Sequence, residues 1–60
     1  MNEQEKEQLA IKWCRLNRGE LFPEISDVST AMGEIEDAIG FQECLKVWNS
    51  KKHLQYRSNS

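Results

Sequence analysis

Helix-breaking residues divide this chain into three segments, and this division limits what the chain can fold into. The only proline is Pro23, and two of the three glycines, Gly19 and Gly40, lie where one apolar pattern stops and another begins. Proline and glycine at such points end one helix or start the next. Between the breaks, apolar residues recur every three or four positions, and no stretch alternates as a strand would. The sequence therefore predicts an all-α fold, either a small three-helix unit or two helices with a kinked C-terminal extension.

The first segment predicts a helix from Glu3 to Arg18. Asn2 and Glu5 have the spacing of an N-cap and its reciprocal carboxylate. Gly19 is suited to the left-handed position that follows a helix C-terminus. Apolar residues cover more than half of the helix surface, and they are Leu9, Ala10, Ile11, Trp13, Cys14 and Leu16. We therefore expect this helix to contact two neighbours.

The second segment predicts a helix from about Pro23 to Ile39, because proline fits the first turn of a helix. Its apolar residues are separated alternately by three and four positions, which is typical of a narrow stripe that packs against another helix. The stripe consists of Ile25, Val28, Met32, Ile35 and Ile39. In the connector before this helix, we expect Leu21 and Phe22 to fold back over the core as a lid.

A change in the direction of the apolar stripe predicts that the chain turns at Gly40. On one straight helix, the apolar residues after Gly40 would face nearly opposite to those before it. We therefore expect a third helix from about Phe41 to His53, folded back at Gly40. The alternative is one long unbroken helix wedged between two partners. In either case the domain spans residues 1–53, and the polar residues 54–60 form a frayed tail.

Large side chains of the first and third helices can meet in one core cluster. Its members are Leu9, Trp13, Leu16, Phe41, Leu45 and Trp48, with the two tryptophans as buried anchors. Cys14 and Cys44 follow a polar N-terminus that does not resemble a secretory signal, so we expect reduced thiols packed as small apolar residues. His53 is expected to be a surface imidazole.

No residue pattern in the chain indicates catalysis or a bound cofactor. There is no glycine-rich phosphate loop or nucleophile elbow, and Cys14, Cys44 and His53 lack the close pairing of a metal site. No run approaches the ~18 apolar residues that a membrane span needs. We therefore expect a non-enzymatic cytoplasmic protein that uses no metal, no cofactor and no membrane. No pattern matches the motif of a known family.

Charge is strongly segregated along the chain, although the net charge is only −2. Residues 20–43 include seven acidic residues and no basic one, whereas residues 44–60 include four basic residues and no acidic one. Such segregation promotes association with an oppositely charged partner. Residues 1–19 include three acidic and four basic residues, and the equal alternative is that the charges of the three segments complement one another within the chain.

The leading hypothesis is a small interaction or regulatory protein, of the kind that bacteria and phages make to modulate a host protein. It would bind a protein partner, basic in character, through the acidic face of the central helix at Asp27, Glu34 and Asp37. The alternative is a small helical DNA- or RNA-binding protein. Its contacts would come from the basic C-terminal segment, at Lys46, Asn49, Lys51, Lys52 and Arg57.

Self-association is the remaining expectation from the sequence. A core this small rarely supplies more than about 3–5 kcal/mol, and many small proteins gain further stability by forming oligomers. A homodimer would use the central stripe of Ile25, Val28, Met32, Ile35 and Ile39 as its seam. The alternative is a monomer in which the first and third helices cover this stripe.

Overall fold

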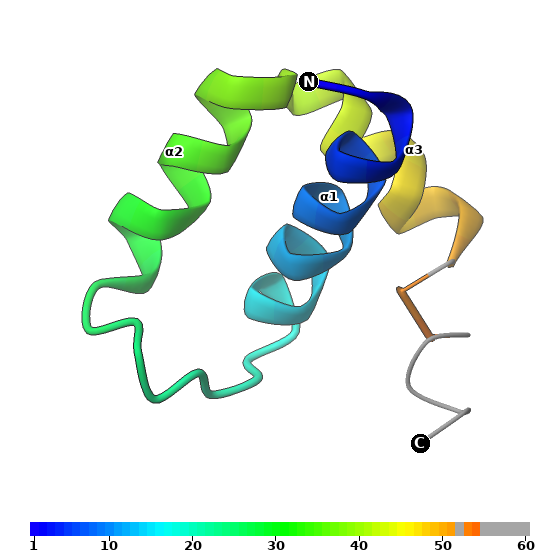
Figure 1. Cartoon of the computed structure of the whole chain (residues 1–60). Coiled ribbons are helices and arrows are strands. Elements are labelled where there is room, and N and C mark those ends of the chain that lie inside the picture. The colour runs from blue at the N-terminus through cyan, green and yellow to red at the C-terminus, as the bar shows by residue number, and fades with distance from the viewer. Residues whose placement is uncertain (52, 55–60) are drawn as a thin grey trace.

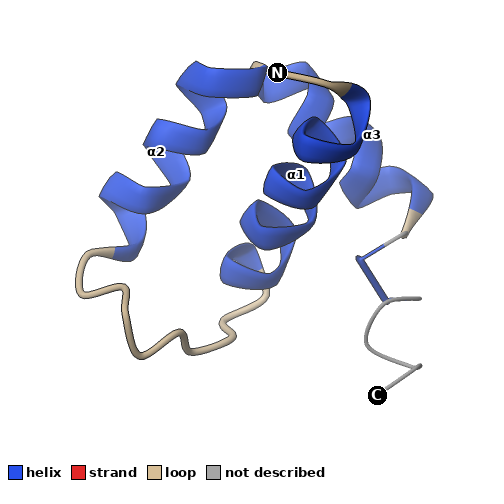
Figure 2. Ribbon diagram, viewed as in Figure 1, coloured by secondary structure: helices blue, strands red, loops and turns tan. Residues whose placement is uncertain are grey.

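A computed structural model of the chain describes residues 1–51, 53 and 54, and within them it contains three helices and no strand (Figure 1). The helices are α1 (Glu3–Asn17), α2 (Val28–Ile39) and α3 (Phe41–Ser50). Figure 2 shows a long loop between α1 and α2, and almost no connection between α2 and α3. The all-α prediction with three helices is confirmed. The frayed tail was predicted for residues 54–60. Leu54 is partly buried, and its N–H donates to the Lys51 carbonyl at 3.0 Å, whereas residues 55–60 lie outside the described residues.

The N-terminal end of α1 forms as its sequence indicates. The Asn2 side-chain oxygen accepts a hydrogen bond from the Glu5 backbone N–H at 2.8 Å, which satisfies one of the free donors of the first turn. At the other end, Gly19 has a φ of +94°, the positive value that glycine tolerates best. The helix ends at Asn17, within one residue of the predicted end.

The predicted start of the second helix at Pro23 was wrong, because α2 begins five residues later at Val28. Asp27 caps it. One oxygen of Asp27 accepts from the Thr30 backbone N–H at 3.1 Å, and the other accepts from the Thr30 hydroxyl at 2.8 Å. A helix starting at Pro23 would instead be capped by Phe22, whose side chain has no acceptor.

The loop between α1 and α2 forms only half of the predicted lid. The ring of Phe22 is partly buried against the core, with the Lys12 ammonium 5.7 Å and the Arg15 guanidinium 5.3 Å from its centroid. Leu21 is 89% exposed, so its predicted contact with the core was wrong. The residue before proline is held in an extended conformation, and in extended backbone neighbouring side chains point to opposite sides. Ile25, predicted within the helix, also belongs to this loop.

The turn at Gly40 is confirmed, and it excludes one long helix through α2 and α3. Gly40 has a φ of +91°, and its N–H donates to the Glu36 carbonyl at 2.8 Å while α3 begins at the next residue. In Figure 1 the two helices meet at this corner, and α1 lies between them. The third helix ends at Ser50 rather than at His53, because Lys51 adopts the left-handed conformation with a φ of 60°.

The core is built around α1, which packs against both other helices as its wide apolar surface predicted. Its buried apolar members are Ala10, Ile11, Trp13, Cys14, Leu16, Ile35, Cys44 and Val47. Trp13 is 4% exposed and donates its indole N–H to a Glu36 carboxylate oxygen at 2.8 Å. Its ring makes edge contacts with Phe41 and Trp48, at centroid distances of 5.9 and 6.4 Å. Phe41 was predicted as core, but it opens α3 at the corner and is 48% exposed.

Both cysteines are free and fully buried, as predicted. The Cys14 thiol lies 3.8 Å from the backbone carbonyl oxygen of Cys44, which places it as a weak donor between α1 and α3. Burial, with a smaller contribution from the neighbouring Cys44, raises the pKa of Cys14 to about 11. Both thiols therefore act as packing groups in their neutral form.

The prediction that His53 is a surface imidazole was wrong. His53 is only 2% exposed, and its ring stacks on Trp48 with a centroid distance of 5.2 Å and an interplanar angle of 6°. The left-handed turn at Lys51 leads the chain from the end of α3 into a further turn at His53 and Leu54. Burial, followed by the charges of Arg18 and Lys51, lowers the pKa of His53. The neutral imidazole is thus the form that packs here.

Candidate interaction groove between α1 and α2

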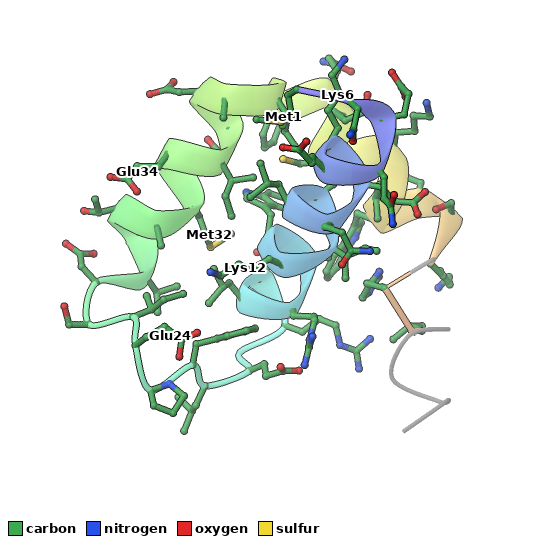
Figure 3. All side chains as sticks on the ribbon, in the orientation of Figure 1. Met1, Lys6, Lys12, Glu24, Met32 and Glu34 are labelled. Atoms are coloured by element: carbon green, nitrogen blue, oxygen red, sulfur yellow. The ribbon has the colours of Figure 1, made fainter. Side chains whose placement is uncertain are left out.

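A groove of about 450 Å³ lies between α1, α2 and the loop that joins them. Its lining residues are Leu9, Lys12, Glu24, Ile25, Ala31, Glu34, Ile35 and Ala38. Figure 3 shows Lys12 on the side of α1 that faces α2, Glu24 on the loop, and Glu34 on the outer side of α2. The groove is thus apolar along its floor and charged at its edges.

The α2 wall of the groove follows from residue spacing. Ala31, Glu34, Ile35 and Ala38 occupy positions i, i+3, i+4 and i+7, which lie on one face of a helix. Ile35 points into the core and is 6% exposed. Ala31 is partly buried and Ala38 is exposed, and the part of the groove beside each of these small side chains is here termed a recess. Small residues at such a spacing let another helix approach closely.

Two carboxylates at the edge of the groove carry uncompensated charge. Glu24 and Glu34 are both exposed, and neither makes an ion pair with any described residue. Lys12 is the basic residue of the lining, and its ammonium lies over the Phe22 ring instead of forming an ion pair with a described carboxylate. The edge of the groove is therefore net negative.

The structure separates the three acidic residues that the sequence grouped as one binding face. Glu34 and Asp37 are exposed on α2, and Glu34 lines the groove. Asp27 is also exposed, but both of its oxygens are engaged in capping α2. Hydrogen bonds from the Thr30 hydroxyl and then from its backbone N–H lower the pKa of Asp27. Glu24, and not Asp27, lies at the groove. It was not predicted there, because a helix starting at Pro23 would have placed Glu24 in its first turn.

The stripe predicted as a dimer seam packs mainly against the core of its own chain. Ile35 is buried, and Ile25, Met32 and Ile39 are partly buried against the same cluster. Val28, at the start of α2, is 41% exposed. The apolar surface that α2 leaves open is therefore the recessed alanine face, with Val28 beyond its end.

The residues predicted for nucleic-acid contacts share their surface with acids. Lys46, Asn49 and Lys51 are exposed on or just after α3, while Lys52 and Arg57 lie outside the described residues. The Lys46 ammonium is 3.8 Å from a Glu43 carboxylate oxygen on the same helix. A small hollow beside it, of about 160 Å³, is lined by Glu3, Glu7, Glu43, Lys46, Val47 and Ser50. Phosphate contact on this side would meet three carboxylates.

One other hollow, of about 440 Å³, runs along the N-terminal end of α1 and is lined by Asn2, Gln4, Glu5, Gln8 and Leu9. It has a wall on one helix only, and so it offers less enclosure than the groove.

Within residues 1–51 and 53–54, no three His, Cys, Asp or Glu side chains gather as a metal site would require. None of the helices described is long and apolar enough to cross a membrane. Comparison with family models, curated proteins and solved structures finds no significant match.

Proposed function

We propose that this protein is a non-enzymatic interaction protein that binds a basic protein partner through the acidic surface around α2. The observation that carries the proposal is the set of exposed carboxylates at Glu24, Glu34 and Asp37 beside an apolar groove, in a segment without any basic residue. Acidic surfaces raise the rate of association with basic partners, and apolar contact then lengthens the lifetime of the complex. By occupying the basic surface of its partner, a protein this small would act as a regulator.

Capture of the partner from an extract of the source cells tests the proposal. The informative variant is the double substitution Glu34→Gln and Asp37→Asn, which removes two charges and leaves the Asp27 cap in place. Its matched control is Gln4→Lys with Gln42→Lys, which changes the net charge equally at exposed positions away from the groove. We expect the wild type and the control to retain one stoichiometric protein at low salt, the double variant to lose it, and moderate salt to weaken retention. Capture of no stoichiometric protein by the wild type would refute the proposal.

DNA or RNA binding stays a prediction, favoured by the exposure of Lys46, Asn49 and Lys51. The Lys46–Glu43 ion pair and the acids beside it count against this function. Titration with mixed-sequence DNA at low ionic strength tests it directly. Saturable binding that weakens with salt would support it, and absence of binding would remove it.

A homodimer also stays a prediction, and Val28 is the member of the predicted seam that is most available to a second copy. Sedimentation equilibrium of the wild type and of Val28→Lys tests this state. A seam dimer requires twice the 7.0 kDa chain mass in the wild type and the single chain mass in the variant. The single chain mass for both proteins would show that the stripe serves only the core.

A further inference from the structure

We infer that the groove between α1 and α2 binds one amphipathic helix of the partner, a helix that carries leucine-like side chains on one face and lysine or arginine along its border. This inference rests on the proposed function and names the class of segment that the acidic surface recognises. Its apolar face would lie on Leu9, Ala31 and Ala38, and its basic residues would lie beside Glu24 and Glu34.

The floor of the groove fits side chains of a helix. Its volume of about 450 Å³ is in the ~300–1,000 Å³ range of ligand sites, but the groove is open to solvent on one side. Two helices form its walls, and an amphipathic helix laid between two others is a recurrent mode of peptide recognition. The recesses at Ala31 and Ala38 are seven residues apart, about two turns of α2. A leucine-like side chain of an adjacent helix could enter each recess.

The edge of the groove decides the charge of the occupant. Glu24 on the loop and Glu34 on α2 both line the groove, and neither has an ion-pair partner among the described residues. A basic border on the incoming helix would pair with both. A second copy of the chain fits less well, because a two-fold axis would bring Glu34 and Asp37 of one α2 toward those of the other.

Binding of a designed peptide tests the inference without knowledge of the partner. The probe is a fluorescein-labelled amphipathic helix of leucine and lysine, about 15 residues long, the length at which isolated helices become appreciably populated. Its charge control replaces every lysine with glutamate. We expect the leucine–lysine peptide to bind the wild type about tenfold or more tightly than the leucine–glutamate peptide. We expect amide chemical-shift changes on α1 and α2 at the groove rather than on α3.

Substitution at Ala38 separates the groove from the charge. Ala38→Gln fills the recess with a neutral side chain at an exposed position that preserves helix propensity, and it should weaken peptide binding about fivefold or more. The control Asn49→Gln places the same side chain on α3 and should leave binding unchanged. Glu34→Gln should weaken binding more than Asp37→Asn, since only Glu34 lines the groove. Circular dichroism of each variant verifies that its helices are intact.

The possible failures are distinguishable from one another. Equal affinity of wild type and Ala38→Gln for the peptide would overturn the groove assignment, and the proposed function would stand if the charge variant still lost its captured partner. Failure of the wild type to bind the leucine–lysine peptide would also overturn it. A wild type that sediments as a dimer, with Ala38→Gln a monomer, would assign the groove to a second copy and overturn the basic helix as its occupant.

Discussion

The hydrogen bond between Trp13 and Glu36 is the polar contact whose removal should most affect stability. It joins α1 to α2 at 2.8 Å, in the half-buried space between the two helices. A hydrogen bond to a charged group contributes about 1.5–3 kcal/mol to folding, and partial exposure places this one near the lower end. A domain of this size has about 3–5 kcal/mol of net stability from its core. A single side-chain contact therefore supplies a large share of the total.

Three substitutions separate the contribution of the Trp13 ring from that of its N–H. Trp13→Ala removes a buried aromatic ring, at a cost of about 3–5 kcal/mol, so little folded protein should remain at 25 °C. Trp13→Phe keeps an aromatic ring but loses the donor and some volume, and we expect a loss of about 2–4 kcal/mol. Glu36→Gln keeps a neutral acceptor and should lose about 1 kcal/mol. That loss corresponds to a fall of about 4–8 °C in the midpoint of thermal unfolding.

Urea and thermal unfolding followed by circular dichroism measure these differences. The matched control is Trp48→Phe, since Trp48 is only partly buried and its indole makes no hydrogen bond with a described residue. It should therefore cost less than Trp13→Phe. In a double-mutant cycle, Trp13→Phe and Glu36→Gln should be less than additive, because Trp13→Phe removes the bond that Glu36→Gln weakens. Equal losses for the two tryptophan variants, with additive effects in the cycle, would refute the assigned role of this bond.

Three other properties of the chain can be measured directly. Cys14 and Cys44 should react with a thiol reagent at pH 8 far more slowly in the folded protein than in urea, since burial raises the pKa of Cys14 to about 11; equal rates would contradict their placement. Burial lowers the pKa of His53, so the unfolded imidazole binds a proton more readily, and the free energy of unfolding should fall as the pH drops below the usual value of 6.5. His53→Phe, which preserves the stack on Trp48, should remove this dependence if His53 causes it. Asp27→Ala should lower the thermal midpoint, while Asp27→Asn should largely retain it. Because the pKa of Asp27 is lowered in the folded protein, its carboxylate should contribute to the free energy of unfolding above the usual pKa of 3.8, and this contribution should vanish as the pH falls through the folded-state pKa.

Local signals predicted the fold well where one residue type decides the backbone. The cap at Asn2 and the turn at Gly40 each depend on a single local property, a short side-chain acceptor or tolerance of positive φ. The start of α2 was missed because Pro23 and Asp27 are competing local signals. The cap at Asp27 satisfies two donors of Thr30, which outweighs the favourable geometry of proline at a first turn.

The candidate site was only partly predictable, because it depends on how the helices are placed. Segregated charge indicated an acidic surface, and Glu34 and Asp37 are exposed on it. The recess at Ala31 and Ala38 could have been noticed as two small residues seven positions apart. That they border a groove follows from the packing of α2 against α1, which no local pattern specifies. The burial of His53 likewise depends on a ring stack across a turn.

The position of α1 between the other two helices has a consequence for how the chain can be divided. Cleavage in the long loop after Asn17 would give one piece that contains α1 and another that contains α2 and α3, and the core is built from both pieces. Neither piece would hold a hydrophobic core alone, since Trp13 belongs to the first piece and Cys44 to the second. Mixing the two pieces should restore helicity only when they assemble. If each piece were fused to one half of a split reporter protein, the reporter signal would appear only when the two pieces assemble.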